Sequence, residues 1–136
     1  MHNESKYNYQ ENKKAYNFVL IALTLNTMVI ISLLKAIPLN YIIGAVIIFN
    51  IIYTLLGFLL AIRVKIYNVH WAKIAIVFGF IQFFRVIILP LEGFFGLALI
   101  LKLLLIISGV LMITASIVTL NRAKIKAGKT MDIESN

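Results

Sequence analysis

Four long apolar runs dominate this sequence and limit the folds that it can adopt. They occupy residues 18–37, 41–62, 74–91 and 95–120. A helix that crosses the roughly 30 Å hydrocarbon core of a bilayer needs about 20 mostly apolar residues, because each residue adds about 1.5 Å. In lipid the backbone groups must be hydrogen-bonded internally, which favours helices for such strongly apolar segments. The sequence therefore predicts four membrane-spanning helices.

The composition indicates that a bilayer is the solvent for most of the chain. Hydrophobic residues make up 62% of the 136 residues and charged residues 13%, whereas soluble domains carry about 45–50% and about 25%. Short segments, KAIPLN and PLEG, separate the first two runs and the last two. We predict an all-α polytopic membrane protein, a compact antiparallel four-helix transmembrane bundle with short outer hairpins. The bundle is expected to cover residues 15–122, between flexible cytoplasmic tails at residues 1–14 and 123–136.

The basic residues are distributed unevenly around the four runs. Ten of the thirteen Lys and Arg residues lie in the two tails and the middle loop, and only Lys35 lies on the opposite side. Because cytoplasmic loops carry the excess of basic residues, we predict a multi-pass protein of the cell membrane with both termini in the cytoplasm. The frequent Ile, Asn, Lys, Phe and Tyr are typical of AT-rich codons and indicate a low-GC bacterium.

The sequence contains no pattern that is typical of catalysis or metal binding. It has no Cys, and its two His residues, His2 and His70, lack a further His at ligand spacing. No Asp or Glu lies well inside a predicted span. We therefore expect a protein that is not an enzyme and holds no metal or cofactor. The net charge of +8 gathers at the ends of the apolar runs, so the expected partner is the lipid bilayer and not a nucleic acid.

One polar side chain lies near the middle of each predicted span. We call this set the polar layer, and it consists of Asn26, Asn50, Gln82 and Ser108. Polar groups in membrane helices tend to face neighbouring helices and hydrogen-bond across them, at about 0.6 kcal/mol on average. We interpret the polar layer as inter-helix contacts that fix the packing and the register. A polar pore or binding layer is the alternative.

Three ionisable residues near the outer ends of the last two spans form a second candidate site. Arg85 and Lys102 lie inside the third and fourth spans, and Glu92 lies in the turn between them. A charge at the centre of a membrane helix costs about 2.5–3.5 kcal/mol on insertion scales, so such residues are functional candidates. Glu92 could pair with Arg85 or Lys102 and lock the hairpin, helped by a bend at Pro90. Alternatively, the cations extend to the outer headgroups, or they bind an anionic lipid or small anion.

These features favour a small non-enzymatic integral membrane protein that acts through helix packing with a partner protein or with itself, as an accessory or structural subunit. The alternative is a small transporter, channel or lipid-handling protein with a cationic outward-facing site around Arg85 and Lys102. A lytic or immunity-type membrane protein is a further alternative, because short four-span chains of low-GC bacteria include such proteins.

Overall fold

The computed structural model describes residues 12–88 and 95–134, which form four α-helices and no strand. In chain order, the helices are α2 (Lys13–Ala36), α3 (Tyr41–Lys65), α4 (Val69–Ile88) and α5 (Phe95–Glu134). Each contains a stretch that is long and apolar enough to cross a membrane. The predicted all-α, four-helix membrane fold is therefore confirmed.

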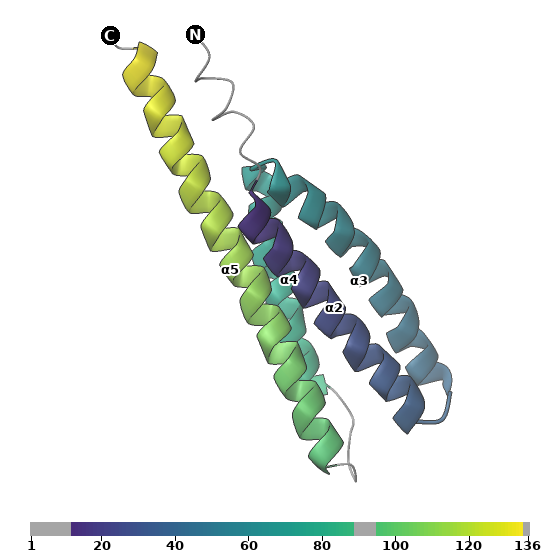
Figure 1. Ribbon diagram of the computed structural model, residues 1–136. Helices are drawn as coiled ribbons and strands as arrows, with labels where there is room; N and C mark the ends of the chain where they lie inside the picture. The colour runs from purple at the N-terminus through teal and green to yellow at the C-terminus, as the bar shows by residue number, and fades with distance from the viewer. Residues whose placement is uncertain (1–11, 89–94, 135–136) are drawn as a thin grey trace.

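The four helices run antiparallel to their neighbours in sequence and pack unevenly (Figure 1). Helix α5 packs extensively against both α4 and α2, and α2 also packs against α3. Helix α3 makes fewer contacts with α4 and very few with α5. Helix α3 is therefore held in the bundle mainly by α2.

Turn residues set the ends of the middle helices. Pro38 lacks the backbone N–H that a continued helix would need, and α2 ends two residues before it. The Asn40 side chain then accepts a hydrogen bond from the Ile43 N–H at 2.9 Å and caps the start of α3. After α3, Tyr67 adopts a positive φ of 59°, and the Asn68 side chain accepts from the Trp71 N–H at 3.3 Å in the first turn of α4. These local contacts make both hairpins short.

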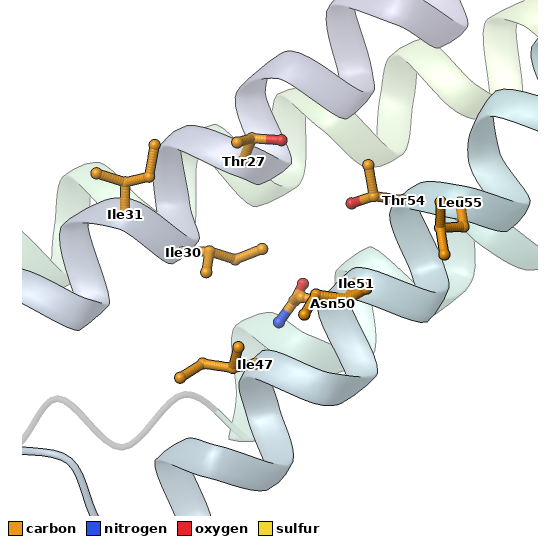
Figure 2. Close-up of a pocket in the computed structure, with 8 residues that line it drawn as sticks. All are labelled: Thr27, Ile30, Ile31, Ile47, Asn50, Ile51, Thr54 and Leu55. Carbon is orange, nitrogen blue, oxygen red and sulfur yellow. The ribbon is translucent and has the colours of Figure 1, made fainter.

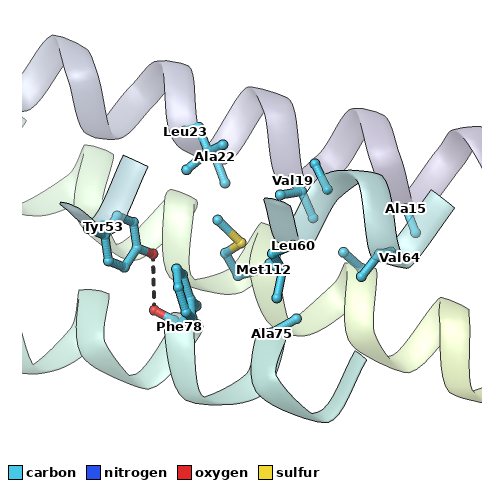
Figure 3. Packing of buried hydrophobic residues seen from close by; sticks show 12 residues of the cluster. Ala15, Val19, Ala22, Leu23, Tyr53, Leu60, Val64, Ala75, Phe78 and Met112 are labelled. Atoms are coloured by element: carbon cyan, nitrogen blue, oxygen red, sulfur yellow. Dashed lines mark hydrogen bonds between the residues drawn. The ribbon is translucent and has the colours of Figure 1, made fainter. Parts of the chain in front are cut away.

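The apolar core joins all four helices (Figure 3). The ring of Tyr53 packs on the ring of Phe78 with 4.8 Å between their centres, and the Tyr53 hydroxyl donates to the Phe78 carbonyl at 3.2 Å. Small residues allow α4 and α5 to approach closely, because a Cβ added to Gly79 would lie 2.9 Å from the Gly109 carbonyl oxygen. The larger core cluster consists of Ala15, Val19, Ala22, Leu23, Tyr53, Leu60, Ala61, Val64, Ala75, Phe78, Met112 and Ala115.

The helix boundaries differ from the predicted tail boundaries at both ends of the bundle. Helix α2 already begins at Lys13, within the segment 1–14 that we expected to be a loose tail. Helix α5 is 40 residues long and continues to Glu134, through the expected loose tail at 123–136. It projects beyond the other helices (Figure 1). The apolar run marks only the part of a helix that suits lipid, and the following Lys and Ala residues favour continued helix.

Candidate functional site

Gln82 of α4 lies at the centre of a buried group of polar side chains. Its Nε2 donates to Asn26 Oδ1 of α2 at 3.2 Å and to Ser108 Oγ of α5 at 3.0 Å. The Ser108 hydroxyl donates in turn to the Ala22 carbonyl of α2 at 2.9 Å. Asn26, Gln82 and Ser108 are fully buried. These bonds connect three helices in the interior, and we call this group, together with Arg85, the polar cluster.

Arg85 directs its guanidinium into the polar cluster. Its Nη1 donates to Gln82 Oε1 at 2.7 Å and also to Asn26 Oδ1. Its Cζ lies 6.0 Å from the centre of the Phe49 ring of α3, which places the cation near an aromatic face. Gln82 lies one turn closer to the start of α4 than Arg85. The guanidinium therefore points back along the helix, away from the C-terminal end of α4 to which a snorkelling side chain would extend.

The charge of Arg85 is surrounded by neutral groups. Residues 12–88 and 96–128, whose side chains the structure describes, contain no Asp or Glu. Within this part of the chain, two buried nitrogens of the polar cluster, Arg85 Nη2 and Asn26 Nδ2, have no hydrogen-bond partner. An unsatisfied buried donor costs about 1–3 kcal/mol. The polar cluster therefore keeps two buried donors free for an oxygen acceptor, such as a water molecule or an anion.

Asn50, the fourth member of the polar layer, does not join the polar cluster. Its Nδ2 donates to the Val46 carbonyl of its own helix at 2.7 Å, and its buried Oδ1 has no partner among the described residues. Figure 2 shows Asn50 at a groove of about 280 Å³ between α2 and α3. We call this the α2–α3 groove, and its lining consists of Thr27, Ile30, Ile31, Ile47, Asn50, Ile51, Thr54 and Leu55. The polar layer is therefore split, because α3 packs mainly on α2.

The second candidate site is described only in part, and no described contact joins Lys102 to Arg85. Lys102 lies half-buried near the start of α5, and it has no hydrogen-bond or ion-pair partner among residues 12–88 and 96–128. Glu92 and Pro90 lie outside the described residues. Locking of the hairpin by Glu92 therefore stays a prediction.

Asn12 is a structural polar residue that sequence reasoning did not single out. Its N–H donates to the Lys65 carbonyl at 2.9 Å, and its Nδ2 donates to Thr119 Oγ1 at 2.8 Å. It is fully buried and ties the start of α2 to the end of α3 and to α5. Its position directly before a helical run, where Asn is a preferred N-cap, was the available signal. Its side chain makes no cap hydrogen bond, however, and serves the tertiary contact instead.

The fold and the polar cluster together define the class of this chain, a multi-pass membrane protein with a charged residue among its helices. Among the side chains that the structure describes, no group of three His, Cys, Asp or Glu could hold a metal ion. No protein family, curated protein or solved structure is found to match the chain.

Proposed function

We propose that this chain is a non-enzymatic integral protein of the cell membrane that packs its helices with a further membrane helix. That helix belongs to a partner protein or to a second copy of the chain, and both termini lie in the cytoplasm. The observation that carries the proposal is the α2–α3 groove, in which the Oδ1 of the buried Asn50 has no partner among the described residues. Inside a bilayer no water is present to bond such an oxygen, so a helix that brings a donor into the groove is stabilising.

The weak packing of α3 supports this role. Helix α3 packs mainly against α2 and makes fewer contacts with α4 and α5. Its outward side chains include Ile51 and Leu55, which are 55% and 65% exposed and border the α2–α3 groove. Helices associate in lipid through close packing and inter-helix hydrogen bonds. The groove offers both, because Thr27 and Thr54 add hydroxyl groups to its lining.

Cysteine chemistry tests this proposal, because the chain has no Cys of its own. A photoreactive maleimide probe attached at Ile51→Cys in the groove should form a protein adduct in native membranes. The matched control is Leu103→Cys on α5, which is 49% exposed and should give only lipid adducts. A product of twice the chain mass identifies a second copy, and a single other product identifies a partner. Equal adduct formation from the two positions would contradict the proposal.

A second candidate function, handling of an anionic lipid or small anion by a small transporter or channel, is favoured by one observation. Arg85 has an unpartnered buried Nη2 beside the amide of Asn26, and the described side chains offer no acid to balance its charge. In this case, Arg85→Met should abolish binding of inorganic phosphate, measured by calorimetry in mild detergent, and should leave the helix content intact. Undiminished binding by Arg85→Met would exclude Arg85 from such a site.

A further inference from the structure

One end of the bundle gathers most of the basic side chains that the structure describes. We call it the cationic end, and it consists of Lys13, Lys14, Arg63, Lys65, Lys73, Arg122, Lys124 and Lys126. All of these except Lys65 and Arg122 are exposed. Residues 12–88 and 96–128 contain no acid, and Lys35 alone lies near the opposite end of α2. The described surface is therefore strongly positive at one end only.

Tertiary contacts bring these cations to one end of the bundle. The hydrogen bonds of Asn12 to the Lys65 carbonyl and to Thr119 Oγ1 align the start of α2, the end of α3 and the middle of α5. Beyond Thr119, the ammonium of Lys126 lies 5.3 Å from the centre of the Tyr67 ring in the turn between α3 and α4. Basic residues from four separate stretches of sequence thus lie around one end of the bundle (Figure 1).

Apolar side chains lie directly beside these cations. Ile62, Ile66 and Val69 flank the end of α3 and the start of α4, and they are 56%, 60% and 42% exposed. Tyr16 and Trp71 pack partly buried against the core at the same end, as is common at a membrane interface. A ligand that suits this surface needs an anionic head and apolar chains below it. A nucleic acid or an acidic soluble protein supplies only the charge.

We propose that the cationic end binds the headgroups of anionic phospholipids and selects them over zwitterionic phospholipids. Each Lys or Arg close to an anionic membrane surface strengthens the attraction, and the effect falls off within a Debye length of about 8–10 Å. The cationic end combines this charge with apolar helix surface at one place. This inference concerns lipid selection and is independent of the proposed helix packing at the α2–α3 groove.

Trp71 provides a built-in probe of this end, because it is the chain's only tryptophan. The purified full chain is reconstituted in phosphatidylcholine vesicles that contain either brominated phosphatidylglycerol or brominated phosphatidylcholine at equal mole fraction. Bromine quenches the fluorescence of Trp71 when the lipid lies beside it. We expect the anionic lipid to bind there about five-fold more strongly, which corresponds to about 1 kcal/mol. High salt should remove the difference, because 1 M salt shortens the Debye length to about 3 Å.

Substitutions assign the effect to the cationic end. The double variant Lys14→Gln and Lys73→Gln removes two exposed cations and should lower the preference at least two-fold. Lys35→Gln, a matched exposed cation near the other end of α2, should leave the preference unchanged. Equal quenching by the two lipids in the parent chain would overturn the proposal. An unchanged preference in the double variant would overturn it as well.

Discussion

At the scale of single residues, the loss of Arg85 and the loss of one of its hydrogen-bond acceptors should affect stability differently. Its Nη1 donates to the amide oxygens of Asn26 and Gln82, and the described side chains include no acid that could balance its charge. Removing a charged group from water costs several kcal/mol, whereas a hydrogen bond to a charged group returns about 1.5–3 kcal/mol. Loss of the Arg85 cation removes both the cost of burying its charge and its hydrogen bonds. Loss of an acceptor removes only one hydrogen bond, and the cost of burying the charge remains.

This asymmetry predicts opposite behaviour of two variants. Asn26→Leu should lower the free energy of unfolding by about 1.5–3 kcal/mol, because the buried guanidinium loses an acceptor. Arg85→Met should change stability little or raise it, because a shorter, flexible apolar chain replaces an unbalanced buried charge. The double variant should recover most of the loss caused by Asn26→Leu. Equilibrium unfolding in mild detergent measures all three.

A control for these variants is Thr24→Val on the same helix. Among the residues that the structure describes, the Thr24 hydroxyl bonds only to the Leu20 carbonyl of its own helix, and Thr24 is exposed. We expect an effect within about 0.5 kcal/mol, as for other surface substitutions. A larger loss of stability in Arg85→Met than in Asn26→Leu would contradict the asymmetry.

At the scale of helices, two glycines bring the backbones of α4 and α5 close together. Gly79 and Gly109 face each other, and a Cβ on Gly79 would lie 2.6 Å from Ile113 Cγ1 and 2.9 Å from the Gly109 carbonyl oxygen. The neighbouring backbone oxygen cannot move aside as a flexible side chain can. Gly44 in α3 has nothing within 4 Å of the same added atom. An added methyl group would therefore clash with α5 at Gly79, whereas it would have open space at Gly44.

Gly79→Ala should destabilise the bundle by about 1–3 kcal/mol, the usual cost of overpacking a well-packed interior. Gly44→Ala should instead leave stability unchanged or raise it by up to about 1 kcal/mol, because Ala favours helix more than Gly does. Thermal unfolding of the two variants in the same detergent provides the comparison. The predicted packing of α4 on α5 would be wrong if both substitutions had the same effect.

At the scale of the whole molecule, the extended part of α5 and most of the cations lie at the same end of the bundle. Helix α5 has 40 residues, about twice the number that a membrane span requires. The excess lies at the cationic end, beyond the other helices (Figure 1). Basic residues are retained on the cytoplasmic side during insertion. The extension of α5 and the turn between α3 and α4 are thus expected in the cytoplasm.

Reporter fusions test this orientation. A reporter that is active only in the cytoplasm should be active when fused at Asn136, and a reporter that needs export should be active when inserted near Asn40. Asn40 lies in the turn that joins α2 to α3, at the end opposite the cationic end. Activity of the export-dependent reporter at Asn136 would show that the orientation is reversed.

The fold class and the number of helices could be predicted from the sequence alone. Each apolar run is long enough to cross a membrane. In lipid, a single segment can hydrogen-bond its own backbone groups only by forming a helix. The depth of Asn26, Gln82 and Ser108 along their helices followed from their places in the runs. Their burial was expected because polar groups in membrane helices tend to face neighbouring helices.

Only the tertiary structure decided which polar groups meet. Asn50 has the same kind of position in its run as Asn26, yet it borders the α2–α3 groove because α3 packs on α2 and hardly on α5. The spacing of Gln82 and Arg85 placed them on one face of α4, but only the assembled bundle shows that this face meets Asn26 of α2 and Ser108 of α5. Lipid is as apolar as the helix surfaces, so burial of apolar side chains does not favour one neighbouring helix over another. The apolar pattern of the sequence therefore does not predict which helices pack together. Close packing and individual hydrogen bonds make that choice, and they depend on atoms from several helices at once.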